Sequence, residues 1–106
     1  MKRGDVIVVG VPGEQPRPAL VVQSDLFDHG HPSVTVLPIT GTLVPAPLFR
    51  VTVEPSPQNG LAVVSQVMVD KLLTIRRDGL ADPIGTFDED VMVRVGRALA
   101  LWTGIA

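Results

Sequence analysis

Short runs of β-branched and apolar residues, each closed by proline, glycine or asparagine, follow one another along the chain as far as residue 76. Runs of about four to eight such residues, bounded by turn formers, are typical of strands. They predict strands over 5–11, 18–24, 33–40 and 48–54, and a segment at 60–75 that is long enough for two strands with a bend. This spacing of strands and turns favours a mainly β fold, a compact strand-and-turn barrel.

The predicted strands differ in how polar their faces are. The first two are apolar on both faces, whereas residues 48–54 alternate, which places Phe49, Val51 and Val53 together on one face. Pro38 lies inside a predicted strand but cannot donate a ladder hydrogen bond. We therefore expect it near a strand end or at a sheet edge.

From residue 86 onward the pattern becomes helical. Thr86 followed by Glu89 matches a capping box, and acidic residues at 88–90 suit the positive end of a helix dipole. One apolar stripe at helical spacing holds Val91, Val95, Ala98, Leu99 and Trp102. Further apolar residues lie beside this stripe, so the helix is either deeply packed or covers a second surface, as it would in a homodimer.

Composition excludes several kinds of site. The chain of 106 residues predicts one domain, 1–106, with no cysteine for a disulfide framework or a thiolate metal site. Its two histidines share one loop and cannot complete a usual zinc set, so we expect no metal and no cofactor. The absence of cysteine fits a reducing cytoplasm, and no apolar run is long enough for a membrane span.

The net charge of −2 argues against binding nucleic acid by bulk attraction, so an anionic partner must be met locally. Arg17 is the first candidate, because Pro16 and Pro18 bracket it and restrict its backbone. A guanidinium held in this way is partly preorganised to grip phosphate or carboxylate. The alternative is an ordinary surface ion pair at the start of a strand.

Other polar residues have both a functional and a structural interpretation. Thr40 ends a predicted strand beside Gly41, where its hydroxyl and nearby amides could hold an anion. His29 and His31 could form a general acid and base pair, although an exposed loop tip explains their spacing as well. Gln66 interrupts an apolar strand and could read a base or satisfy buried backbone. The one concentrated basic patch consists of Lys71, Arg76 and Arg77.

Seven segments, taken in order, resemble the MazF/PemK family of type II toxins. They are KRGDVIVV, GEQ, RPALVVQSDLF, VTVLPIT, PLFRVTVEP, GLAVVSQVMVDKLLTI and IGTFDEDVMVRVGRALAL, and they cover nearly the whole chain. The resemblance implies an SH3-like barrel with a C-terminal helix, acting as a homodimer. It also implies a metal-independent endoribonuclease that cuts single-stranded RNA at a short sequence and leaves a 2′,3′-cyclic phosphate and a 5′-OH.

The resemblance carries the family's catalytic arginine and threonine over to Arg17 and Thr40. The residues that it implies as substrate contacts are Glu14, Gln15, Arg50, Gln66, Lys71, Arg76 and Arg77. A cognate antitoxin is expected to silence the toxin, and DNA is expected as a partner of the toxin–antitoxin complex only. No membrane partner is expected.

Two departures from the family pattern stand out. Pro16 alone separates Glu14–Gln15 from the Arg-Pro motif, and Ser65–Gln66 replaces a common Asp-Gln pair. The chain also lacks an excess of positive charge, so we expect a groove that is only locally basic. Two alternatives remain open. One is a gyrase poison of the CcdB type, because the chain ends LWTGIA, and the other is an SH3-like binding module without chemistry.

Overall fold

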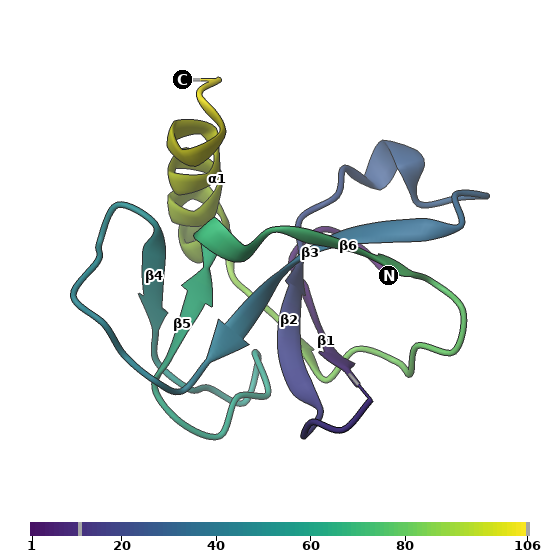
Figure 1. Ribbon diagram of the computed structural model, residues 1–106, viewed down its shortest axis with the longest axis horizontal. Coiled ribbons are helices and arrows are strands. Elements are labelled where there is room, and N and C mark those ends of the chain that lie inside the picture. Colours follow the sequence, from purple (N-terminus) through teal and green to yellow (C-terminus); the bar gives the residue numbers. More distant parts are fainter. Residues whose placement is uncertain (11, 106) are drawn as a thin grey trace.

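One curled antiparallel sheet forms most of the molecule (Figure 1). The computed structural model describes residues 1–10 and 12–105. The strands are β1 (Asp5–Val9), β2 (Arg17–Val21), β3 (Ser33–Thr40), β4 (Arg50–Val53), β5 (Ser65–Met68), β6 (Leu73–Arg76) and β7 (Gly85–Thr86). The helices are α1 (Glu89–Thr103) and two single 3-10 turns, η1 (Asp25–Phe27) and η2 (Val69–Lys71). The prediction of a mainly β fold with a C-terminal helix is confirmed.

The predicted strands are recovered, most of them shorter than expected. β3 has the predicted bounds, and the segment at 60–75 is two strands with a bend, β5 and β6, which η2 joins. Val11, which the prediction included in the first strand, lies outside the described residues. β7 and η1 were not predicted, because two or three residues carry too little periodicity to reveal an element.

β3 is the central strand of the sheet. Within the described part of the chain, the order is β4-β5-β3-β2-β1-β7, and β6 also pairs with β3. β6 pairs with residues 33–36 of β3, whereas β5 pairs with Ile39 and Thr40. Pro38 therefore lies where β3 changes partner on that side, a position that needs no ladder donor there. Pro38 is two residues from the end of β3, near a strand end as predicted, and it lies beside this break in pairing.

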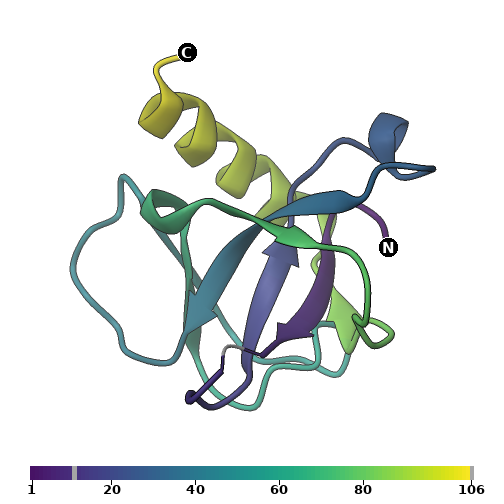
Figure 2. The ribbon, with the colours of Figure 1, turned by 45° about the vertical axis from the view of Figure 1, so that its right-hand side comes forward.

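Apolar residues cover both faces of the sheet. One cluster, the helix-side core, includes Leu20, Leu37 and Val67 from the strands and Val95 and Ala98 from α1. A smaller cluster on the opposite face holds Ile7, Ala19, Val21, Val34 and Val36. The apolar character of the first two strands on both faces is explained by these two clusters, since alternate residues of a strand supply opposite faces. Figure 2 shows α1 running along one side of the sheet, with the C-terminus at the opposite end of the molecule from the β1–β2 turn.

The predicted capping box at the start of α1 is wrong. Thr86 belongs to β7, where its hydroxyl donates to the carbonyl oxygen of Gly4 at 3.2 Å. The helix cap is Asp88, whose carboxylate accepts a hydrogen bond from the backbone N–H of Val91 at 2.9 Å. The helix begins two residues later than predicted, because Thr86 pairs with Asp5 of β1 and cannot also cap the helix. The predicted acidic first turn is present, with Glu89 and Asp90.

Gly85 allows β7 to pass close to the turn at 55–60. A Cβ on Gly85 would lie 2.4 Å from the carbonyl carbon of Asn59 and 2.5 Å from the carbonyl oxygen of Gln58. We expect Gly85→Ala to lower the free energy of unfolding by about 3 kcal/mol, since backbone on both sides would have to move. Urea unfolding measures this loss. Gly10→Ala is the control, because a Cβ there meets no atom within 4 Å, and equal stability of the two variants would contradict the prediction.

Candidate active site at the ends of β2 and β3

The register of the sheet brings Arg17 and Thr40 together. β2 and β3 run antiparallel, with Leu20 opposite Leu37 and Ala19 opposite Pro38. Continued by two residues, this register sets Arg17, at the start of β2, opposite Thr40, at the end of β3. Directly opposed residues project from the same face of a sheet. The two predicted catalytic residues therefore share one face, although 22 positions lie between them in the sequence.

Both residues line one open groove of about 420 Å³. The other walls come from the end of β3, the turn that follows it, and the segment before β5. The lining residues are Arg17, Pro18, Ile39, Thr40, Gly41, Thr42, Leu61, Ala62, Val63 and Ser65. This volume admits a phosphate group together with part of a sugar, so the groove can receive a nucleotide backbone between the two side chains.

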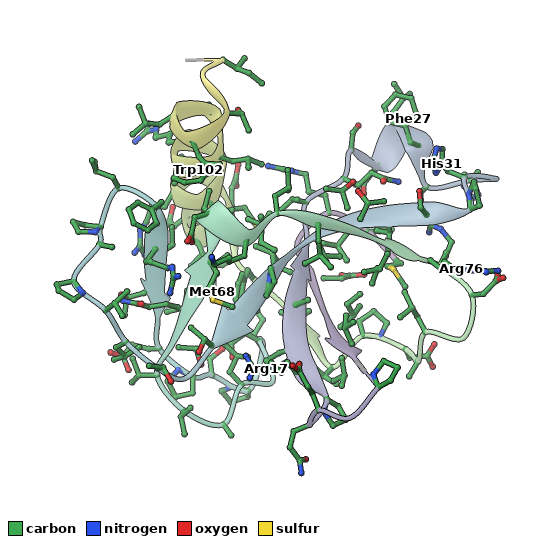
Figure 3. All side chains as sticks on the ribbon, viewed as in Figure 1. Arg17, Phe27, His31, Met68, Arg76 and Trp102 are labelled. Atoms are coloured by element: carbon green, nitrogen blue, oxygen red, sulfur yellow. The ribbon has the colours of Figure 1, made fainter. Side chains whose placement is uncertain are left out.

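Arg17 is exposed, and no described residue forms an ion pair or a side-chain hydrogen bond with it. The structure therefore does not support the alternative that Arg17 forms an ordinary surface ion pair with another described residue. The guanidinium keeps its donors available for a ligand in the groove. Figure 3 shows Arg17 near the β1–β2 turn, far from His31 and Phe27 at the other end of the sheet.

The hydroxyl of Thr40 is oriented by the turn that follows it. Its oxygen accepts a hydrogen bond from the backbone N–H of Thr42 at 3.1 Å. Because that bond occupies a lone pair of the oxygen, the hydroxyl proton remains free to be donated. A cation and an oriented O–H donor that face one groove form a site suited to a phosphate oxygen.

The chain matches the family model described as "PemK-like, MazF-like toxin of type II toxin-antitoxin system" over residues 2–103. It belongs to this family of toxins. The match favours the nuclease family over both the gyrase poison and the binding module without chemistry.

Two curated relatives align with almost the entire chain. The probable endoribonuclease MazF of Mycolicibacterium smegmatis is 43% identical over 109 residues, covering 100% of this chain and 99% of the relative. Endoribonuclease EndoA of Bacillus subtilis is 30% identical over 107 residues, covering 95% of this chain and 92% of the relative. The toxin is thus similar along its full length to proteins named as endoribonucleases.

Solved structures show the same fold. An endoribonuclease in complex with its cognate antitoxin from Mycobacterial species has a TM-score of 0.83 at 24% identity, covering 100% of this chain and 97% of that chain. A MazE–MazF structure (Form-II) from Deinococcus radiodurans has a TM-score of 0.82 at 21% identity, with the same coverage of both chains. The curled sheet and C-terminal helix are therefore the fold of MazF toxins.

Two of the expected substrate contacts lie beside Arg17. Glu14 and Lys71 line a second cavity of the toxin, of about 370 Å³, which Arg17 also lines. Gln15 lies in the same exposed loop as Glu14. The cations expected in the locally basic groove are Arg17, Arg50, Lys71, Arg76 and Arg77, and two of them, Arg17 and Lys71, line this cavity. Their roles in binding substrate stay predictions.

Gln66 lies in β5, and its side chain holds the loop at Val44. Its side chain is 5% exposed, its amide oxygen accepts from the N–H of Val44 at 3.0 Å, and its amide nitrogen donates to the carbonyl oxygen of Val44 at 2.9 Å and to the Thr52 hydroxyl at 3.2 Å. Of the two interpretations of this residue, satisfaction of buried backbone describes these contacts. Both N–H groups of the amide are used and the residue is buried, so direct contact with substrate is not what the geometry favours.

Arg50 is likewise occupied. Its Nε and one terminal nitrogen donate to the two carboxylate oxygens of Asp70 at 2.8 and 3.2 Å, and both side chains are mostly buried. This pair joins β4 to η2. The hydrogen bond from Arg50 lowers the pKa of Asp70 below its usual value of 3.8. Arg50 thus has a structural role, and its role in binding substrate stays a prediction.

Arg76 and Arg77 lie away from the groove. Arg76 pairs with Asp78 at 3.2 Å in an exposed ion pair, and Figure 3 shows it far from Arg17. Arg77 donates to Asp28 at 2.7 Å and to the carbonyl oxygen of His31 at 3.0 Å. The hydrogen bond from Arg77 lowers the pKa of Asp28. The predicted basic patch is therefore divided, and Arg77 secures the loop that carries the histidines.

The loop of the predicted histidine pair is far from the groove, since Figure 3 shows His31 far from Arg17. His31 Nδ1 accepts from the backbone N–H of Ser33 at 3.2 Å, on the exposed loop that follows η1. No group of three histidine or acidic side chains among residues 1–10 and 12–105 is arranged to hold a metal ion. In the same described part of the chain, no helix is both long enough and apolar enough to cross a membrane.

Three residues of the site were not predicted from the sequence. Thr42 orients the hydroxyl of Thr40, and Met68 and Pro38 line the second cavity. Thr42 acts through its backbone N–H, which no side-chain pattern reveals. Met68 looks like an ordinary strand residue in the sequence, and Pro38 stood out only for its missing ladder donor. The signal that could have found them is strand register, because β3 places Pro38 two residues from Thr40 on the same face.

The Arg50–Asp70 pair predicts how stability depends on pH. We expect Asp70→Asn to lower the free energy of unfolding at pH 7 by about 1.5 to 3 kcal/mol, the usual range for a hydrogen bond to a charged group. Because the folded-state pKa of Asp70 is lowered, this stabilisation is fully present above pH 3.8 and is lost as pH falls through the folded-state pKa. Urea unfolding at pH 7 and pH 2 measures both effects. Asp82→Asn is the control for loss of an exposed carboxylate, and an Asp70→Asn difference that is the same at both pH values would contradict the prediction.

Proposed function

We propose that this toxin, acting as one domain, is an endoribonuclease that cuts single-stranded RNA at a short sequence without a metal ion. The observation that carries the proposal is the convergence of Arg17 and Thr40 on one open groove. The full-length similarity to proteins named as endoribonucleases supports RNA as the substrate. The products are a 2′,3′-cyclic phosphate and a 5′-OH.

The chemistry needs two groups that act on the phosphate. The ribose 2′-oxygen attacks the adjacent phosphorus and loses its proton, while the bond from phosphorus to the 5′-oxygen breaks and that oxygen gains a proton. Negative charge grows on the non-bridging oxygens as the fifth bond forms. Arg17 stabilises this charge with its guanidinium, and Thr40 donates its hydroxyl proton in a hydrogen bond to one of these oxygens. Both also hold the phosphate in line for attack.

The proposal includes two protein partners. Exposed apolar residues on the last turns of α1, Leu101 and Trp102, are each about half exposed, at 53% and 52%, and suit a second copy of the chain. Structures of relatives in complex with antitoxins support a cognate antitoxin. The antitoxin would cross the Arg17 groove and displace the loop before β2. We expect DNA contact only for the complex, and action in the cytoplasm, where the RNA substrate is found.

The test uses purified protein, a mixed-sequence RNA and excess EDTA. We expect cutting to continue at one short sequence, and the fragments to carry cyclic phosphate and 5′-OH ends, because the site supplies its own cation and donor. Sequencing of the fragment 5′ ends identifies the recognised sequence. Loss of cutting in EDTA would reject the metal-independent mechanism, and intact RNA in every buffer would reject the nuclease function.

A further inference from the structure

A second cavity begins where the Arg17 groove ends. Its volume is about 370 Å³, and Arg17 and Pro18 line both spaces. It lies where β3 changes partner from β6 to β5, because its walls include Met68, at the end of β5, and Leu73, at the start of β6. The sheet itself therefore opens this cavity beside the proposed position of the phosphate.

The walls of this cavity are apolar, and two exposed charges of opposite sign accompany them. Apolar contacts come from Val9, Pro18, Ala19, Val36, Pro38, Met68 and Leu73. The charged side chains other than Arg17 are Glu14 and Lys71. Apolar walls with a few polar groups at the edge suit a nucleobase, since its faces pack against apolar atoms and its edge forms hydrogen bonds. The thioether of Met68 can contact an aromatic ring favourably.

We propose that this cavity binds the base of a nucleotide next to the cleaved phosphate, and that it selects a base with an exocyclic amino group over uracil. The inference deepens the proposed function and rests on it for the position of the strand. A nucleotide whose phosphate contacts Arg17 can place its base in the adjoining cavity, because Arg17 lines both.

Glu14 is the residue that selects the base. An ionised carboxylate only accepts hydrogen bonds, so it pairs with the amino group of cytosine, adenine or guanine. Uracil has no exocyclic amino group. Its one donor at that edge, N3–H, is flanked by two carbonyl oxygens, and these repel a carboxylate that approaches it. Lys71 only donates, so it pairs with a ring nitrogen or a carbonyl oxygen of the selected base. One acceptor and one donor thus read one edge.

Met68 makes the cavity observable without RNA cleavage. Protein with carbon-13 in its methionine methyl groups has three reporters, Met1, Met68 and Met92. Nucleoside monophosphates are titrated and followed by NMR. We expect the Met68 methyl signal to shift with CMP, AMP and GMP at least about fivefold more tightly than with UMP, and we expect Met92, which packs against Gly4, to remain unmoved. Inorganic phosphate, which has no base, should leave Met68 unmoved as well.

Two variants sharpen the test. Glu14→Gln should bring UMP to within about twofold of CMP, because an amide can donate to a carbonyl oxygen as well as accept from an amino group. Asp82→Asn removes the same charge from an exposed loop and should leave the preference unchanged. A Met68 signal that ignores all four nucleotides, or equal binding of UMP and CMP to the unchanged protein, overturns the inference.

Cleavage gives an independent readout. Uracil should be absent from one of the two positions that flank the cut, and Glu14→Gln should admit it there with the rest of the recognised sequence unchanged. Lys71→Met should weaken selection at that same position, with Lys2→Met as its control. If the nuclease proposal is wrong, the RNA stays uncut. If this inference is wrong, the RNA is cut, and the recognised sequence is the same for the unchanged protein, Glu14→Gln and Lys71→Met.

Discussion

Arg17→Ala should lower kcat for RNA cleavage by about 10³- to 10⁵-fold, the range found when a positioned arginine is removed from phosphoryl transfer. The loss should fall mainly on kcat, because the guanidinium acts most strongly on charge that develops in the transition state. No described side chain pairs with Arg17, so its removal breaks no ion pair in the described structure, and the fold should remain intact. Single-turnover cleavage of a short RNA that contains the recognised sequence measures the effect.

Two further variants separate catalysis from simple charge. Arg17→Lys keeps the positive charge but loses the planar fork, so it should recover only part of the lost activity. Arg97→Ala removes one guanidinium from the exposed side of α1 and should cut at the normal rate. Cleavage by Arg17→Ala within about threefold of the unchanged protein would reject Arg17 as catalytic.

Thr40→Val should lower kcat by about 10²- to 10³-fold, or about 2.7 to 4 kcal/mol, as expected for one preorganised donor to a developing anion. Valine has almost the same shape and is favoured in strands, so β3 should persist. Thr40→Ser keeps the hydroxyl and should cut at close to the normal rate. The same single-turnover assay compares the three proteins.

Thr40 also accepts a hydrogen bond from the N–H of Thr42, so a lost turn must be separated from a lost donor. Urea unfolding reports the stability of each variant. Thr74→Val, which removes an exposed hydroxyl of β6, is the matched control for the substitution. Normal kcat in Thr40→Val would show that Thr40 only fills the end of its strand.

A variant that combines Arg17→Ala with Thr40→Val tests whether the two residues act on the same transition state. Groups that act on one transition state are not additive, so the double variant should lose less activity than the product of the two single losses. Purely additive losses in activation free energy would mean that Arg17 and Thr40 act independently of each other. Because both residues line one groove, we expect losses that are not additive.

Much of the fold could be predicted from local patterns. Short apolar runs, with a period of two at 48–54, identified the strands, the period of 3.6 identified α1, and turn residues separated them. β3 was predicted with the bounds that the structure has. The capping box failed because Thr86 satisfied the local pattern but was needed in a strand pairing with β1, a contact with a segment about 80 residues away.

The candidate site could be predicted only in part. Arg17 was singled out by its two prolines, whereas Thr40 had no distinctive local pattern and depended on family resemblance. Several expected contacts proved to be used elsewhere: Gln66 holds a loop and Arg50 holds Asp70. Sequence shows that such a residue can form hydrogen bonds, but not whether another part of the protein already uses them.

By itself, the sequence determined which segments are strands, where the helix lies, and that an anionic partner needs a local cation, since these follow from periodicity and charge along the chain. Tertiary structure alone decided that Arg17 and Thr40 face one groove, that Arg50 and Arg77 are paired, and that a cavity opens beside Pro38. The reason is physical. Antiparallel register joins residues that are distant in the chain, and a side chain's partners are settled only when those neighbours have been brought together.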